Sequence, residues 1–174
     1  LKFAKRLLEL EPEIKLVIDQ PMEFKHKRLI DLSGQIDSPE KFKALVGQMD
    51  GVITVNSFAS HVADLCSTPA VHMCSCLSGS FYPYYPFSAA INPPGYEQLP
   101  AHGKVKVAED EWEKIKGDYQ AAWARLNPAE VLKLLKEKMA QRQEVQREPR
   151  GLALVGERKQ PSCISGTTPR LELS

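Results

Sequence analysis

The chain has 174 residues, of which 43% are hydrophobic and 26% are charged, a composition typical of a soluble globular domain with its own core. The 23 Lys and Arg residues nearly balance the 22 Asp and Glu residues, and this net charge of +1 gives no reason to expect nucleic acid or an anionic membrane as a partner. No apolar run approaches the roughly 20 residues of a membrane span. The few, unevenly spaced cysteines favour a reducing, cytoplasmic setting. Because Leu1 is not an initiator Met, we expect an excised fragment or a processed chain.

The first part of the chain predicts one helix and two strands. An apolar stripe that includes Leu7 and Leu8 indicates a helix over residues 1–10. The β-branched run 14–19 predicts a strand, and the weaker run 28–32 predicts a second one. A polar connection separates these two strands.

Strands and helices then alternate. Ser38, followed by Pro, is a typical N-cap, and the helix after it carries apolar residues at one-face spacing: Phe42, Leu45, Val46 and Met49. Residues 52–55 form a continuous apolar strand, and residues 70–74 form another. Between them, residues 58–66 predict a helix with Phe58, Val62 and Leu65 in register. This alternation predicts an α/β fold with a Rossmann-like, doubly wound parallel sheet.

The remainder predicts a loop, two helices and a tail. Residues 75–100 are rich in Ser, Pro, Gly and Tyr and predict a long ordered loop, whose Tyr82, Tyr84 and Tyr85 either stack on a ligand or pack the loop onto the sheet. Residues 108–126 predict a helix, and Asn127 followed by Pro opens another. We therefore expect a domain over residues 1–142 and a mostly disordered tail over residues 143–174, where the apolar patch 152–155 is able to dock on the domain or on a partner.

The most informative segment is the junction at residues 52–61, where a buried strand passes almost directly into a helix. The first N–H groups of such a helix are unpaired and point beyond the carboxyl end of the sheet, where open α/β folds bind ligands and where phosphate is favoured. Asn56, Ser57 and Ser60 add polar side chains, and His61 is able to donate to a phosphate oxygen. The competing interpretation is ordinary helix capping, with His61 satisfying a neighbouring carbonyl.

The same segment resembles a family signature. The run Val-Ile-Thr-Val-Asn-Ser-Phe-Ala-Ser-His-Val-Ala at 52–63, followed by Pro69-Ala70-Val71, is similar to that of heptosyltransferase-like GT-B glycosyltransferases, including the version that follows tetratricopeptide repeats. In that family an apolar strand is followed by Asp, then by Ser or Thr, then by a small residue, two further residues and His. Residues 30–34 resemble the family's Asp-Leu-Thr-Gly turn, and the Tyr/Pro-rich loop resembles its Pro/aromatic loop. The match covers residues 1–135, which corresponds to the C-terminal half of such an enzyme.

The resemblance implies a donor site for a nucleotide-diphosphate sugar. It places Asn56, Ser57, Phe58 and Ala59 around the diphosphate, with His61 supporting the turn. Two positions depart from the family pattern, because Asn56 replaces the usual acid and Phe58 replaces the small residue. The family's catalytic base belongs to the N-terminal half, so we expect no catalytic residue, no metal and no cofactor in this fragment, which alone is inactive. Its expected partner is that missing half or a repeat domain.

Alternatives remain at three points. The departures also fit a non-catalytic binding or interaction module on the same fold, and a sugar-nucleotide epimerase-type domain shares the architecture. Glu23, after the first strand, is a candidate ribose partner or a solvated surface residue. The segment 72–76 places His72, Cys74 and Cys76 on one strand face, but it lacks the paired Cys spacing of a structural zinc site and is more typical of a sheet core.

Overall fold

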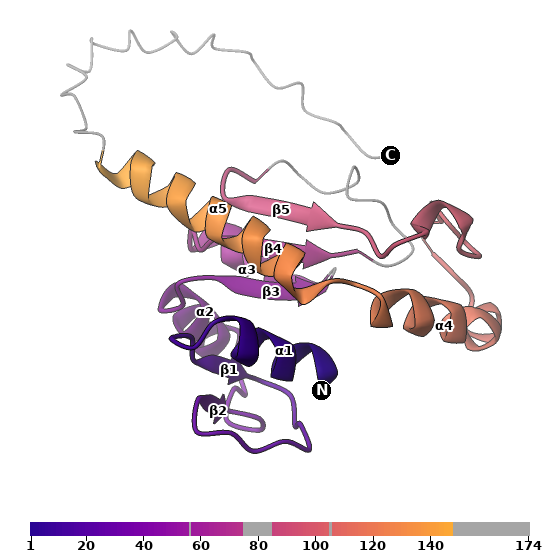
Figure 1. Cartoon of the computed structure of the whole chain (residues 1–174), viewed down its shortest axis with the longest axis horizontal. Helices are drawn as coiled ribbons and strands as arrows, with labels where there is room; N and C mark the ends of the chain where they lie inside the picture. Colours follow the sequence, from indigo (N-terminus) through magenta and orange to yellow (C-terminus); the bar gives the residue numbers. More distant parts are fainter. Residues whose placement is uncertain (56, 75–84, 105, 148–174) are drawn as a thin grey trace, which may run out of the picture.

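The computed structural model describes residues 1–55, 57–74, 85–104 and 106–147, and within them the fold is mixed α/β with parallel strands throughout (Figure 1). One sheet has two strands, β1 (Leu16–Ile18) and β2 (Leu29–Asp31). The other has three strands in the order β3-β4-β5, which are Val52–Val55, Ala70–Met73 and Ser88–Ile91. Five α-helices belong to the described residues: α1 (Lys2–Leu10), α2 (Pro39–Gly47), α3 (Phe58–Leu65), α4 (Glu109–Ala124) and α5 (Pro128–Arg147).

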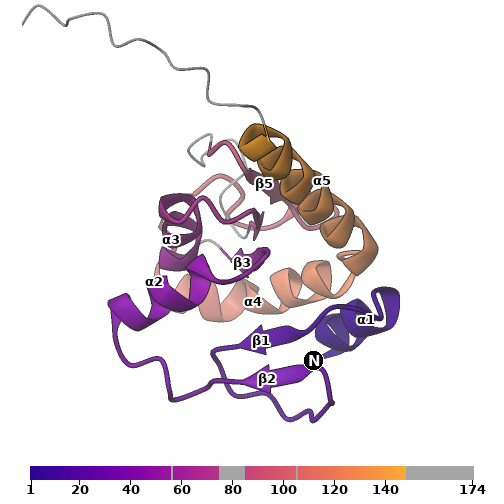
Figure 2. The same cartoon turned by 90° about the vertical axis from the view of Figure 1, so that its left-hand side faces the viewer.

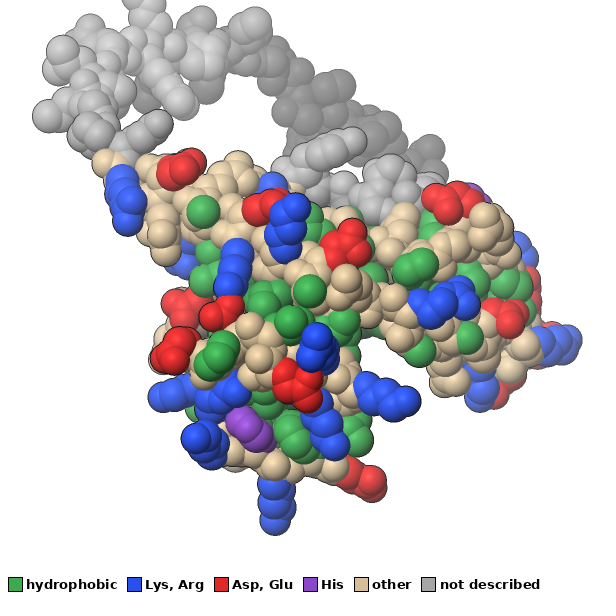
Figure 3. Space-filling model, in the orientation of Figure 1, with side chains coloured by type: hydrophobic (Ala, Val, Ile, Leu, Met, Phe, Trp, Pro, Cys, Tyr) green, Lys and Arg blue, Asp and Glu red, His purple; other side chains and the backbone are tan. Residues whose placement is uncertain are grey.

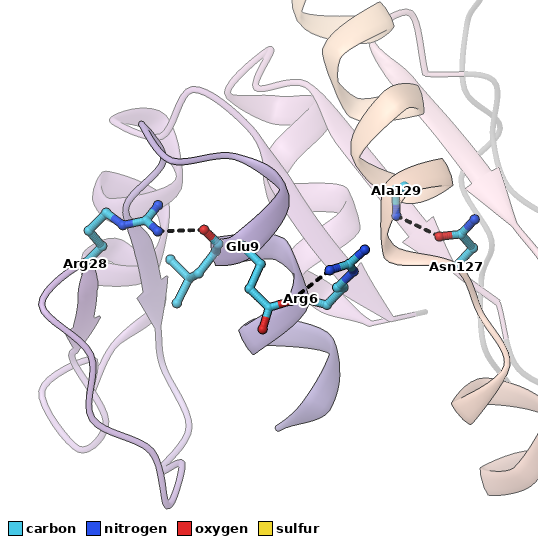
Figure 4. A network of polar contacts seen from close by, with 6 residues as sticks. Arg6, Glu9, Arg28, Asn127 and Ala129 are labelled. Carbon is cyan, nitrogen blue, oxygen red and sulfur yellow. Dashed lines mark hydrogen bonds and ion pairs between the residues drawn. The ribbon is translucent and has the colours of Figure 1, made fainter.

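Helices α2 and α5 begin where a side chain accepts a hydrogen bond from one of their first N–H groups. Ser38 accepts a hydrogen bond from the backbone N of Lys41 at 3.2 Å, and Pro39 occupies the first helical position of α2. At the start of α5, the Asn127 side chain accepts from the backbone N of Ala129 at 3.0 Å (Figure 4). Both starts agree with the capping signals in the sequence.

The central strand β4 is buried on both faces. Its register pairs Val71 with Ile53 of β3 on one side and with Ala89 of β5 on the other. Helices α2 and α3 cover one face, where Val46, Val62, Ala63 and Ala70 form a core cluster, as Figure 2 shows. Helix α5 covers the other face, where the buried residues of the second cluster are Val71, Leu126, Val131 and Leu135.

Arg28 joins α1 to the two-stranded sheet. Its Nη1 donates to the backbone oxygens of Glu11 (2.7 Å) and Ile14 (3.2 Å), and its Nη2 donates to the backbone oxygen of Leu8 at 2.6 Å. Figure 4 shows the Arg28 guanidinium beside α1 with one of these bonds drawn. The last carbonyls of a helix lack intrahelical partners and carry partial negative charge. The Arg28 guanidinium therefore satisfies carbonyl groups at the C-terminus of α1 and holds the start of β2 beside this helix.

The parallel α/β pattern is confirmed, but the strands do not form one continuous sheet in the described residues. β1 and β2 make a separate pair. Ile30 and Asp31 of β2 are exposed. The β1–β2 sheet therefore lacks the covering on both faces that a central strand requires. Only the coarse α/β class is therefore established by the fold.

The elements in the second half of the chain differ from the expected ones at two places. The segment predicted as a loop over 75–100 contains β5, and a short 3-10 turn follows at Tyr96–Gln98. Helix α5 continues to Arg147, beyond the predicted end of the domain at residue 142. The loop residues 75–84 and the tail residues 148–174 lie outside the described residues, so the expectations for them stay predictions.

Replacing Arg28 with Ala removes the hydrogen bonds that close α1, and we expect the free energy of unfolding to fall by roughly 2 kcal/mol. Arg6→Ala is the matched control, because among the described residues Arg6 forms just an exposed pair with Glu9 on the same helix (Figure 4), and loss of that pair costs at most about 0.5 kcal/mol. Urea unfolding of both variants measures the difference. Equal effects of the two substitutions would contradict this role for Arg28.

Substitution of two valines of α5 tests how much the packing of this helix on β4 contributes to stability. Val131 is fully buried, so Val131→Ala lowers the free energy of unfolding by roughly 2 kcal/mol through lost apolar burial and an incompletely filled cavity. Val145 is 55% exposed, and Val145→Ala changes stability by less than about 0.5 kcal/mol. Thermal or urea unfolding of the pair tests this arrangement, which fails if Val131→Ala is as mild as its control.

Candidate functional site

The carboxyl ends of three parallel strands lie at one edge of the larger sheet. β3, β4 and β5 end at Val55, Met73 and Ile91, and their arrows point the same way in Figure 1. Helix α3 begins at Phe58, almost directly after β3. Its first backbone N–H groups therefore face outward at this edge, which is where ligands bind in open α/β sheets.

Ser57 forms the turn between β3 and α3. Its Oγ accepts a hydrogen bond from the backbone N of Ala59 at 3.3 Å and lies 3.2 Å from Oγ1 of Thr54. The buried Ser60 donates from its Oγ to the backbone oxygen of Ser57 at 2.7 Å. Two hydroxyls and a helix N-terminus are thus held together at the strand end. Asn56 lies outside the described residues, so its role stays a prediction.

Phe58 lies on the side of α3 that faces α2. Its ring centroid is 6.0 Å from that of Phe42 in α2, and the side chain is 59% exposed. Leu65 is 67% exposed on the same helix, and of the three apolar residues predicted in register only Val62 is buried. Phe58, Val62 and Leu65 line a shallow groove of about 360 Å³ between α2 and α3. The buried residues of α3 are Ser60, Val62 and Ala63, and the last two belong to the core cluster under α2 and α3.

His61 is held by a tyrosine from the segment that leads into β5. Its Nδ1 lies 2.6 Å from the hydroxyl oxygen of Tyr85, and the two rings meet edge to face with centroids 6.0 Å apart. His61 also lines the groove between α2 and α3. The sequence offered no signal for this long-range contact between Tyr85 and α3. The two uses considered for the tyrosines, stacking on a ligand and packing on the sheet, stay predictions.

His72 is a buried histidine at the centre of the sheet. Desolvation, with a smaller contribution from the nearby His61, lowers its pKa from the ordinary 6.5 to about 4. Cys74, also buried, donates weakly from Sγ to the backbone oxygen of His72 at 3.6 Å. In the described residues no three His, Cys, Asp or Glu side chains gather as metal ligands, and Cys76 lies outside them.

Glu23 is separate from the residues around Ser57. It is exposed in the connection between β1 and β2, which belongs to the two-stranded sheet. Figures 1 and 2 both show that sheet at the opposite end of the molecule from β5. The structure therefore brings Ser57, Phe58, Ala59 and His61 together on one helix and leaves Glu23 on another unit.

Neither a family model, nor a curated protein, nor a solved structure matches the chain. Within the described part of the chain, no helix has both the length and the apolar character needed to cross a bilayer. A functional proposal for this chain therefore rests on the geometry of the β3–α3 junction.

The buried His72 predicts a specific loss of stability in acid. The unfolded chain protonates this imidazole near pH 6.5, whereas the folded chain keeps it neutral down to about pH 4, so lowering the pH favours unfolding. Between pH 8 and pH 5, this one group removes roughly 2 kcal/mol from the free energy of unfolding. Urea titrations at several pH values compare the wild type with His72→Gln.

The His72→Gln variant loses this part of the pH dependence, whatever its stability at pH 8. His102→Gln, which replaces an exposed histidine, is the matched control and follows the wild type. Identical pH profiles for wild type and His72→Gln would show that burial of His72 does not depress its pKa.

Proposed function

We propose that the chain is the C-terminal, donor-binding half of a GT-B glycosyltransferase of the heptosyltransferase-like type, with a Rossmann-like fold that binds a nucleotide-diphosphate sugar. The observation that carries this proposal is the β3–α3 junction, where Ser57 and Thr54 hold hydroxyls at the N-terminus of a helix. The same residues carry the family resemblance in the sequence. The parallel pairing of β3 with β4, and of β4 with β5, adds support.

The chemistry of the junction suits a diphosphate. The dipole at the N-terminus of α3 stabilises negative charge, and the hydroxyls of Thr54 and Ser57 lie beside it as hydrogen-bonding groups. A diphosphate leaving group gains negative charge as the glycosidic bond to the sugar breaks, so donors fixed at this edge act on the transition state without a metal ion. The base that deprotonates the acceptor hydroxyl is supplied, in this proposal, by the missing N-terminal half.

The position of Phe58 bears on the proposed donor site. Its ring packs near Phe42 and lines the groove between α2 and α3, so its bulk extends toward α2. A large residue at this position is therefore compatible with a phosphate that contacts the backbone at the turn. Replacement of the family's acid by Asn56 removes one negative charge from the site, which reduces repulsion of a diphosphate but also removes a carboxylate acceptor.

A non-catalytic interaction module on the same fold is the second candidate. It is favoured by the exposure of Phe58 and Leu65 along one side of α3, beside the groove between α2 and α3. Exposed apolar side chains that line a groove are typical of surfaces that bind other proteins. This candidate predicts a macromolecular partner and no affinity for nucleotides.

Calorimetric or NMR titration with nucleoside diphosphates and nucleotide sugars separates the two candidates. The proposal expects binding at millimolar or lower ligand concentration, accompanied by shifts of amide signals at Ser57 and Ala59. Ser57→Asp keeps an N-cap side chain but places a negative charge at the site, so affinity falls by about tenfold or more. Ser38→Asp makes the same change at the N-cap of α2 and leaves the affinity unaltered.

Two results would count against the donor site. The first is the absence of binding by any nucleoside diphosphate at millimolar concentration. The second is an equal loss of affinity in Ser57→Asp and Ser38→Asp, because this would indicate a general charge effect. His61→Ala adds a further check, since a supporting role for His61 predicts weaker binding as well as lower stability.

A further inference from the structure

A second groove lies between the end of α1 and one side of α5. It has a volume of about 480 Å³, and we call it the α1–α5 groove, lined among others by Leu10, Ala129, Leu132, Lys136 and Ala140. The α5 residues in this set follow each other at intervals of three or four, so they share one helix face. Figure 3 shows hydrophobic side chains at the surface between α1 and α5. The apolar α5 residues of this groove, Ala129, Leu132 and Ala140, are distinct from Val131 and Leu135, with which α5 packs on β4.

The sequence after Arg147 offers an occupant for the groove. Leu152-Ala153-Leu154-Val155 is the one run of four consecutive apolar residues in 148–174. We propose that this segment packs in the α1–α5 groove as an extended strand, antiparallel to α5. The proposal assigns an intramolecular partner to a surface that the donor-site proposal does not use.

The distances allow this arrangement. A helix rises about 1.5 Å per residue, so Ala140 lies roughly 10 Å back along α5 from Arg147. Residues 148–152 reach up to about 17 Å when extended, which is enough to reverse direction and arrive beside Ala140. Pro149 cannot continue the helix, and Gly151 suits a reversal of the chain. The four apolar residues then span about 13 Å, compared with roughly 16 Å between Ala129 and Ala140 along α5.

The charges on each side of the apolar run match this direction. Arg150 precedes the run and Glu157 follows it. An antiparallel path brings Arg150 near the exposed Glu144 and Glu157 near the exposed Lys133. A parallel path does not give this pairing. Lys136 already forms an ion pair with Glu11 across the groove, so the end of α1 and the side of α5 are held together before the segment arrives.

Because the segment 152–155 is covalently attached to α5, weak apolar contacts are sufficient to hold it in the α1–α5 groove. Because the segment follows α5 directly, its effective concentration at the groove is in the millimolar range, and it needs only modest intrinsic affinity to occupy the site. In an extended strand alternate side chains face the same side, so Leu152 and Leu154 point into the groove while Ala153 points outward. This alternation provides a matched pair of substitutions.

Hydrogen exchange of the full chain tests the proposal. We expect the amides of 152–155 to exchange at least about tenfold more slowly than those of 165–170 in the same tail. Leu154→Asp abolishes this protection, whereas Ala153→Asp retains it. On the groove side, Ala140→Arg abolishes the protection, whereas Gln141→Arg, at the next exposed position of α5, retains it.

Three results would overturn the proposal. In the first, the amides of 152–155 exchange as fast as those of 165–170. In the second, protection survives Ala140→Arg, so the segment docks elsewhere. In the third, protection falls on dilution while light scattering shows a dimer, which means that a second copy of the chain occupies the groove.

Discussion

Burial of β4 on both faces is the constraint on which the rest of this structure depends. A strand whose two sides both exclude water needs a paired strand along each edge and a helix layer over each face. β3 and β5 supply the edges, α2 and α3 cover Ala70, and α5 covers Val71. The same burial desolvates His72 and lowers its pKa, so a structural requirement of the sheet also determines how the protein responds to acid.

The candidate donor site follows from that constraint. Because β3 must pair with β4 in parallel, the chain has to cross back over the sheet, and α3 is the crossover. Its N-terminus therefore lies at the carboxyl edge, where Ser57 caps it and Thr54 adds a second hydroxyl. Val62 and Ala63 of α3 belong to the core cluster, whereas Phe58 and Leu65 lie at the surface. The proposed phosphate-binding turn and the exposed apolar groove are thus two sides of one short helix.

The N-terminal unit is attached by different means. β1 and β2 are not hydrogen-bonded to the larger sheet in the described residues, and Arg28 connects them to α1 through three backbone carbonyls. Helix α1 in turn lies beside α5, where Phe3 packs against the core cluster that includes Val71. Both the core and the α1–α5 groove therefore involve α5, which makes this helix the common support of the two units.

The sequence by itself determined the features whose causes are local. The N-caps at Ser38 and Asn127, the strand at 52–55 and the position of Ser57 at a helix start all follow from neighbouring residues. Tertiary structure decided the rest. β5 is built from Ser88, Ala89, Ala90 and Ile91, whose weak strand preference becomes effective only when β4 offers a free edge. Packing likewise decided that Phe58 faces α2 and that His61 contacts Tyr85, because partners distant in sequence leave no local pattern. The separation of the two sheets, which leaves Glu23 in the β1–β2 connection away from Ser57, is also a tertiary feature.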